Sequence, residues 1–120
     1  MSNPLKILFA SAEVVPFAKT GGLADVAGAL PKALEELGHD IRVVMPRYGR
    51  IDIEKFHLQK VIEHLDVPMN HSTETVAIYK GNIGKNVPVY TIDSPNFFNR
   101  EGIYGYQDDG ERFILFCRAA

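Results

Sequence analysis

The stretch P-F-A-K-T-G-G-L-A-D-V-A-G, residues 16–28, decides the fold because it sets a glycine pair between an apolar run and an amphipathic segment. Before it, residues 5–10 are nearly all apolar, which is typical of a strand buried on both faces. After it, apolar residues recur at helical spacing, at Leu23, Val26, Ala27, Leu30, Leu34 and Leu37. Gly38 then provides a stop signal, and residues 41–45 form a second apolar run. The order strand, helix, strand predicts a right-handed βαβ unit.

The remaining segments extend this unit. Three runs rich in β-branched residues predict further strands, at residues 60–67, 73–80 and 87–92, with a glycine-containing turn between the last two. Residues 57–65 also fit a helical pattern, and we favour the strand. A final helix is predicted from Asp108, with Asp108 and Glu111 spaced as a capping box. We therefore expect an α/β, Rossmann-like fold whose sheet is mostly parallel and carries a hairpin extension.

The composition is that of one ordinary globular domain. The chain has 120 residues, 46% of them hydrophobic and 23% charged, and a formal net charge of -2. This charge gives no reason to expect binding to nucleic acid or to an anionic membrane. An apolar stretch of the roughly 18 residues that a membrane span needs is missing from the sequence. Cys117 is the single cysteine, which excludes an internal disulfide, and we predict that it is a buried, inert thiol.

The glycine pair also suggests a binding site. The first loop of a βαβ unit lies at the carboxyl edge of the sheet, where open α/β folds bind ligands. Gly21 and Gly22 would permit a tight turn and a close approach to the backbone, and the following helix N-terminus suits a phosphate. Lys19 adds a positive charge, and Asp25 could accept hydroxyl protons from a sugar. From spacing alone, a purely structural turn with a solvated lysine is the favoured interpretation. The loop matches neither the dinucleotide-binding fingerprint nor a Walker A motif.

Two other groups of residues are candidate ligand sites. Four aromatic side chains cluster after the last predicted strand, at Phe97, Phe98, Tyr104 and Tyr106. They could stack on a sugar, but packing of the loop onto the core is the simpler interpretation. The four histidines, at positions 39, 57, 64 and 71, show no helical pair and no ligand cluster, so we predict no metal site and no cofactor.

A resemblance then sharpens the functional reading. The stretch S-A-E-V-V-P-F-A-K-T-G-G-L-A-D-V-A-G-A-L-P-K-A-L, residues 11–34, closely resembles the N-terminal signature of bacterial glycogen synthases and plant starch synthases. The motifs V-V-M-P-R-Y, I-D-S-P-N-F-F-N-R, I-Y-G-Y and E-R-F-I-L-F resemble the same family and follow in its order. The resemblance implies transfer of glucose from ADP-glucose to the non-reducing end of an α-1,4-glucan, with retention of the anomeric configuration. It also implies two Rossmann-like domains facing each other across a cleft, the GT-B arrangement.

The family's K-x-G-G-L motif maps onto this chain residue by residue. The match implies that Lys19, Gly21 and Gly22 contact the phosphates of the donor and that Glu13 and Asp25 line the donor cleft. The active-site glutamate and a later histidine of the family are expected outside these residues. We therefore expect residues 1–120 to be part of the N-terminal catalytic domain and to be inactive alone.

Two alternatives stay open at this point. One is another two-domain glycosyltransferase that uses a different nucleotide-sugar, and the other is a stand-alone nucleotide-sugar-binding module. The expected partners are ADP-glucose and an α-1,4-glucan, and the expected location is the cytoplasm, or a plastid for a plant source.

Overall fold

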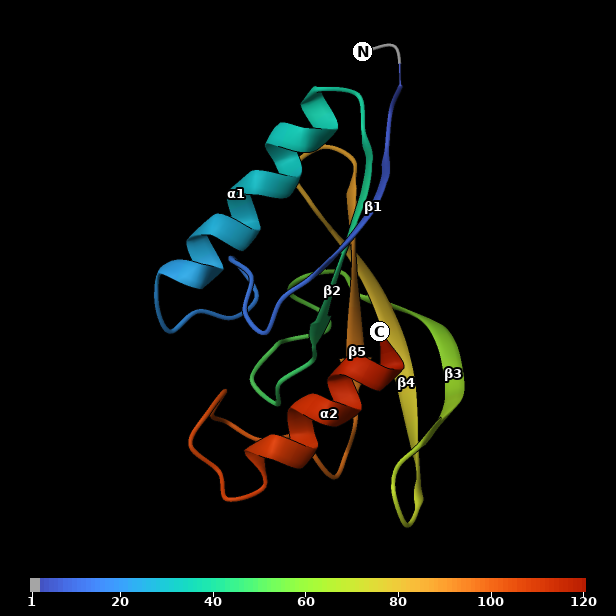
Figure 1. Ribbon diagram of the computed structural model, residues 1–120. Helices are drawn as coiled ribbons and strands as arrows, with labels where there is room; N and C mark the ends of the chain where they lie inside the picture. Colours follow the sequence, from blue (N-terminus) through green and yellow to red (C-terminus); the bar gives the residue numbers. More distant parts are fainter. Residues whose placement is uncertain (1–2) are drawn as a thin grey trace.

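The predicted strand–helix–strand unit is present in the computed structural model, which describes residues 3–120 (Figure 1). It consists of β1 (Lys6–Ala10), α1 (Gly22–Glu36) and β2 (Asp40–Pro46). β1 and β2 pair in parallel, with Ile7 opposite Ile41 and Phe9 opposite Val43. Gly38 follows α1 with a φ of 96°, a conformation that favours glycine, and this turns the chain into β2.

The rest of the sheet is a meander. The strands β3 (Gln59–Pro68), β4 (Thr73–Ile83) and β5 (Val87–Asp93) confirm the three predicted runs, and β3 resolves the ambiguous segment as strand. The order across the sheet is β1-β2-β5-β4-β3. β5 runs parallel to β2, whereas β4 pairs antiparallel with both β5 and β3. The sheet is therefore mixed, and the expectation of a mostly parallel sheet is wrong, because the hairpin strands contribute as many pairings as the parallel core.

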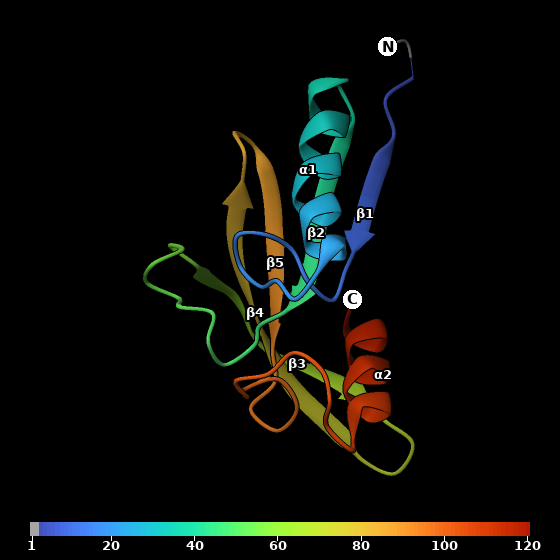
Figure 2. The same ribbon diagram turned by 90° about the vertical axis from the view of Figure 1, so that its left-hand side faces the viewer.

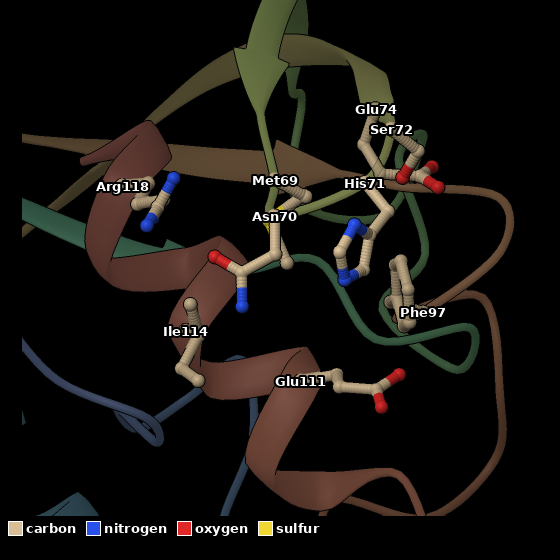
Figure 3. Close-up of a pocket in the computed structure, with 9 residues that line it drawn as sticks. All are labelled: Met69, Asn70, His71, Ser72, Glu74, Phe97, Glu111, Ile114 and Arg118. Carbon is tan, nitrogen blue, oxygen red and sulfur yellow. The ribbon is translucent and has the colours of Figure 1, made fainter.

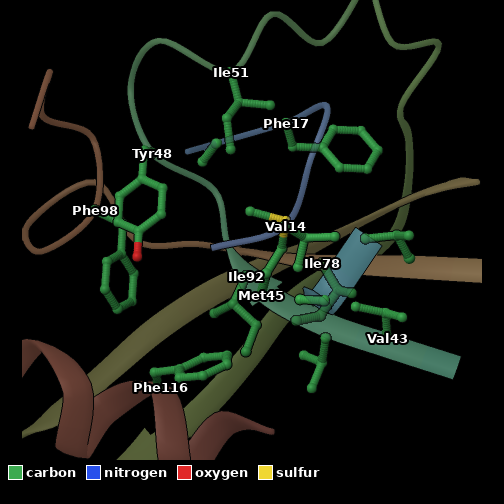
Figure 4. Packing of buried hydrophobic residues seen from close by; sticks show 14 of the residues in the cluster. Val14, Phe17, Val43, Met45, Tyr48, Ile51, Ile78, Ile92, Phe98 and Phe116 are labelled. Atoms are coloured by element: carbon green, nitrogen blue, oxygen red, sulfur yellow. The ribbon is translucent and has the colours of Figure 1, made fainter. Parts of the chain in front are cut away.

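The two helices pack on different parts of the sheet. α1 contacts β2 and β5, and α2 (Asp109–Ala119) contacts β3. Figure 2 shows α1 alongside β1 and β2, with α2 near the other end of the sheet. Apolar side chains from the strands and from α2 fill the core, among them Val43, Met45, Ile78, Ile92 and Phe116 (Figure 4). Within residues 3–120, neither helix is long and apolar enough to cross a membrane.

The buried face of α1 is not formed by its large apolar residues. Its buried residues are small or compact: Ala24, Ala27, Gly28 and Pro31. A β-carbon at Gly28 would collide with the side chain of Val15, so α1 lies too close to the preceding loop for a larger residue there. Leucines and valine of the predicted apolar pattern instead face outward, at Leu23, Val26, Leu30 and Leu37.

Two predictions about α2 are wrong in detail. Asp108 is the N-cap residue but makes no side-chain capping bond, because its carboxylate pairs with Arg100 at 2.6 and 2.8 Å. Cys117 is exposed, not buried. The buried positions of α2 are Arg112, Leu115 and Phe116, and a residue one step beyond them leaves that face. The apolar pattern did not predict that an arginine, Arg112, occupies one of these buried positions.

Candidate functional site

The predicted site lies where three parallel strands end. Because β1, β2 and β5 are parallel, their carboxyl ends share one edge of the sheet. The loop of residues 11–21 follows β1 and leads into α1 at this edge. The segment of residues 94–108, which follows β5, folds back against that loop. All five residues singled out from the sequence lie on the first loop or in the first turn of α1.

Glu13 is the centre of this loop. Its side chain is only 2% exposed. One carboxylate oxygen accepts hydrogen bonds from the backbone N–H groups of Thr20 and Gly21, each at 3.1 Å. The other oxygen accepts from the Thr20 hydroxyl at 2.8 Å and from the Tyr104 hydroxyl at 2.7 Å. The glutamate therefore draws the K-T-G-G segment back onto the start of its own loop.

These bonds keep Glu13 charged. Burial by itself raises the pKa of the carboxyl group, but the hydrogen bonds from Tyr104, from Thr20 and from the Gly21 N–H stabilise the anion. Together they lower the pKa of Glu13 to about 2, from an ordinary value of 4.5. Burial, together with the hydrogen bond to Glu13, raises the pKa of Tyr104 to about 12. At neutral pH the pair is a carboxylate and a protonated phenol.

Lys19 and Asp25 form an ion pair on the outer side of the loop. The Lys19 ammonium lies 2.9 and 2.8 Å from the two oxygens of Asp25, and the two side chains are 52% and 56% exposed. Asp25 belongs to the first turn of α1. The pair thus holds a cation beside the N-terminus of α1 while leaving it accessible to solvent.

The glycine pair faces open space. Apart from the adjacent residues and the backbone of α1, no heavy atom lies within 4 Å of the position that a β-carbon would take at Gly21 or at Gly22. Gly21 has an extended backbone, with φ -162° and ψ -159°, and neither glycine has a positive φ. The turn itself therefore does not require glycine, which removes the tight-turn interpretation of the pair. What glycine provides here is the absence of a side chain, which leaves space above the backbone.

The N-terminus of α1 adds donors to the same surface. Among residues 3–120, the Gly21 N–H is taken by Glu13, whereas the N–H groups of Gly22 and Leu23 have no acceptor. Such first-turn donors and the helix dipole favour an anion. The N–H groups of Gly22 and Leu23 thus lie beside the Lys19 ammonium, whose charge is paired with Asp25.

Sequence reasoning missed the residue that shapes the second segment. The guanidinium of Arg112 is fully buried and donates to the carbonyls of Phe97 and Ile103 and to the Asp109 carboxylate. Asp109 in turn accepts from the N–H groups of Gly105 and Tyr106. These bonds fold the segment so that Tyr104 reaches Glu13. The E-R-F motif contained this arginine, but a single charge in an apolar helix pattern gives no sign of burial.

The four aromatic residues of that segment have separate roles, and Phe97 is partly buried and packs against the core. Phe98 is buried and packs edge-to-face against Tyr48, whose hydroxyl donates to the Ala12 carbonyl at 2.7 Å. Tyr106 accepts from the Gly102 N–H. Tyr104 is partly exposed beside the loop. The packing interpretation therefore holds for Phe98, while Tyr104 belongs to the site.

Another hollow lies away from this loop. A cavity of about 350 Å³ is found between the β3–β4 turn and α2, and Figure 3 shows its polar and apolar lining. None of residues 11–21, the loop of the predicted site, lines this cavity. Among residues 3–120, no three His, Cys, Asp or Glu side chains are grouped to hold a metal ion.

Comparisons with known proteins agree on one family. The sequence profile described as "Starch synthase catalytic domain" matches residues 6–120. The glycogen synthase of Moorella thermoacetica is 50% identical over 121 residues, which cover 99% of this chain and 24% of the relative. Glycogen synthase 1 of Geobacter sulfurreducens is 48% identical, over 97% of this chain and 25% of the relative.

A solved structure gives the same answer. The catalytic domain of Starch Synthase IV from Arabidopsis thaliana, bound to ADP and acarbose, superposes with a TM-score of 0.88 at 31% identity. The superposition covers 98% of this chain and 24% of that one. The chain thus spans about a quarter of the length of the relatives that it matches. It belongs to the starch synthase catalytic domain family of glycosyltransferases, together with the glycogen synthases.

Proposed function

We propose that this chain supplies the donor-phosphate loop of an enzyme that transfers glucose from ADP-glucose to an α-1,4-glucan. The observation that carries the proposal is the open glycine pair at the N-terminus of α1, beside the accessible ammonium of Lys19. The structural relative bound to ADP and acarbose supports a nucleotide donor and a glucan acceptor. ADP is the product that remains when glucose leaves ADP-glucose.

The chemistry explains why such a loop is useful. In the transfer, the bond between the anomeric carbon and the β-phosphate oxygen breaks, and a bond to the acceptor 4-hydroxyl oxygen forms while that hydroxyl loses its proton. Negative charge grows on the departing diphosphate. The Lys19 ammonium and the N–H groups of Gly22 and Leu23 would stabilise that charge where it develops. A β-carbon on the glycine pair would obstruct the approach of the phosphates.

The two carboxylates of the site have different roles in this proposal. Glu13 accepts four hydrogen bonds from the loop and Tyr104, so it acts as the group that shapes the loop behind the donor. Asp25 holds the Lys19 ammonium in place before the donor arrives. When the donor phosphates bind the Lys19 ammonium, the Asp25 carboxylate can instead accept hydrogen bonds from the hydroxyl groups of the sugar.

The remaining catalytic groups are assigned to the rest of a longer protein. Residues 1–120 form, in this proposal, part of the N-terminal half of a two-domain enzyme. Retaining transfer between large substrates needs a donor that is oriented against its acceptor and shielded from water. One open surface does not provide this, so the isolated chain would bind the donor weakly and transfer nothing.

The test uses a protein of the relatives' length that contains this chain. Lys19→Ala should lower kcat/KM for ADP-glucose by about ten- to a hundredfold, because a charge-assisted contact to phosphate is worth roughly 1.5–3 kcal/mol. Lys32→Ala, which removes an exposed lysine on α1 away from the loop, is the matched control and should leave kcat/KM unchanged. Equal kinetics for Lys19→Ala and wild type would refute the phosphate role of the loop.

A further inference from the structure

The side chain of Arg112, on α2, is completely buried, although arginine is seldom found inside a protein unless it is paired. Its Nε donates to the Phe97 carbonyl at 2.6 Å. Its Nη1 donates to the Ile103 carbonyl at 2.9 Å and to the Asp109 carboxylate at 2.8 Å. Two of these acceptors lie in the segment of residues 94–108, and the third is the first residue of α2. One guanidinium thus holds this segment at several points.

Aromatic rings surround the same guanidinium. Its central carbon lies 4.7 Å from the centre of the Tyr106 ring and 5.5 Å from the centres of the Phe98 and Phe113 rings. The faces of these rings attract a cation, which offsets part of the cost of burying the charge. A lysine ammonium would carry the same charge, but it cannot present donors in a fixed planar fork. Arg112→Lys therefore keeps the charge and removes the geometry.

The segment that Arg112 holds brings Tyr104 to the loop of residues 11–21. Arg112 bonds the carbonyl of the residue before Tyr104. The Asp109 carboxylate, which Arg112 also bonds, accepts from the N–H groups of the two residues after Tyr104, at 2.8 and 3.2 Å. The backbone of Tyr104 is therefore held on both sides, and its hydroxyl donates to Glu13 at 2.7 Å.

We propose that Arg112 is a positioning residue for the donor-phosphate loop, acting through Tyr104 and Glu13. The inference rests on the function proposed above and identifies what supports that site. Because Arg112 is completely buried, it contributes geometry and makes no contact with the donor. When Tyr104 is displaced, Glu13 loses one of the four hydrogen bonds with which it shapes the loop. The amide donors at the start of α1 then lose their alignment, and a misplacement of about 1 Å can cost on the order of a hundredfold in rate.

Steady-state kinetics distinguish this role from a purely structural one. A variant that only unfolds more readily leaves less active enzyme, so its apparent kcat falls while both KM values stay the same. A displaced donor loop instead raises the KM for ADP-glucose. It leaves the KM for the glucan acceptor unchanged, because in this proposal the acceptor does not bind the loop.

A double-mutant cycle in a protein of the relatives' length tests the inference. Arg112→Lys should lower kcat/KM for ADP-glucose by about tenfold, mainly through KM. Tyr104→Phe, which removes only the hydroxyl, should have a similar effect. In the Tyr104→Phe background, Arg112→Lys should cause less than about a twofold further change, because the bond through which it acts is already absent. Arg118→Lys, at an exposed arginine of α2 that bonds the β3 end, is the matched control and should leave the kinetics unchanged.

Asp109→Asn provides a second route to the same answer where Arg112→Lys fails to fold. The Asp109 side chain is 31% exposed, and asparagine keeps its size while removing the charge that pairs with Arg112. Asp109→Asn should raise the KM for ADP-glucose severalfold. This effect, too, should disappear in the Tyr104→Phe background.

The inference is overturned by an unchanged KM for ADP-glucose in Arg112→Lys, or in Asp109→Asn where the first variant does not fold. It is also overturned by wild-type kinetics in Tyr104→Phe, or by equal effects of Arg112→Lys with and without the Tyr104 hydroxyl. Lys19→Ala tests the proposed function separately. A lowered kcat/KM in Lys19→Ala together with wild-type kinetics in Arg112→Lys refutes only the positioning role, whereas wild-type kinetics in Lys19→Ala refute the phosphate role of the loop.

Discussion

The Tyr104 hydroxyl donates a 2.7 Å hydrogen bond to the Glu13 carboxylate, across 91 positions of sequence. This contact joins the loop after β1 to the segment after β5 at the edge where the parallel strands end. Glu13 uses its other bonds to hold Thr20 and Gly21, so the tyrosine is connected through one carboxylate to the glycine pair. A substitution of Tyr104 should therefore affect the loop of residues 11–21.

The first prediction measures this connection. A double-mutant cycle of Glu13→Gln and Tyr104→Phe should give a coupling free energy of roughly 1 kcal/mol in urea unfolding, because a hydrogen bond to a charged group is lost only once. Solvent access to Tyr104 keeps this coupling below the roughly 1.5–3 kcal/mol typical of a hydrogen bond to a charged group. The control pair is Glu13→Gln with Tyr90→Phe, since the Tyr90 hydroxyl accepts from Arg42 and shares no partner with Glu13. Additivity in the test cycle would show that the two residues act independently.

The second prediction concerns acid. The pKa of Glu13 is about 2 in the folded chain and near its ordinary 4.5 when unfolded, so the unfolded state binds the proton more tightly. The stabilisation is therefore complete above about pH 4.5 and is lost as the pH falls towards 2, on the order of 3 kcal/mol in total. Glu13→Gln should lower stability at pH 7 and flatten the dependence of unfolding free energy on pH in this window. The exposed Glu101→Gln is the control, and an unchanged slope in Glu13→Gln would contradict the assignment.

Much of the fold could be predicted because its signals are local. Every predicted strand and both helices are present, and the ends of α1 follow from the glycines on either side. The antiparallel pairing of β4 with both β5 and β3 depends on tertiary packing, and the prediction of a mostly parallel sheet is wrong for that reason. The prediction of which residues α1 and α2 bury was wrong for a related reason. Hydrophobic periodicity identifies a stripe, but it does not say whether the stripe meets this part of the molecule or another.

The candidate site was predictable in its residues and less so in its contacts. A glycine pair at a helix start is visible in sequence, and so are Lys19, Asp25 and Glu13. The ion pair between Lys19 and Asp25 joins residues only six apart and could have been foreseen. The bond from Tyr104 to Glu13, and the buried guanidinium of Arg112 that supports it, depend on how distant segments fold together.

The third prediction concerns the isolated chain of residues 1–120. Its exposed surface offers the Lys19 ammonium and the N–H groups of Gly22 and Leu23. Within residues 3–120, no second surface faces them. ADP should therefore bind at about millimolar strength, near 4 kcal/mol. Titration followed by NMR should shift the amide signals of residues 19–23 and leave the β3–β4 turn unaffected. Glucose incorporation into a glycogen primer should be undetectable. Turnover by the monomeric chain, or micromolar affinity, would show that the site is complete within these residues.

The fourth prediction contrasts two glycines of the same helix. Gly22→Ala places its methyl group in open space and without a positive φ, so stability should stay equal or rise by up to about 1 kcal/mol. ADP affinity should nevertheless fall at least tenfold in the full-length enzyme, since the methyl group occupies the approach to the phosphates. Gly28→Ala should instead lower the stability measured by thermal unfolding. Its methyl group meets the Val15 side chain, and overpacking of this kind costs about 1–3 kcal/mol.

Calorimetric titration with ADP and thermal unfolding of both variants separate two roles for the loop. A binding surface predicts lost affinity with unchanged stability at Gly22, and lost stability at Gly28, whose contact with Val15 sets how closely α1 approaches the loop. A loop that is only a structural connection predicts wild-type ADP affinity in Gly22→Ala. Because the structure leaves open space above Gly22, no packing change would obscure that second result, and wild-type affinity would remove the phosphate from this end of α1.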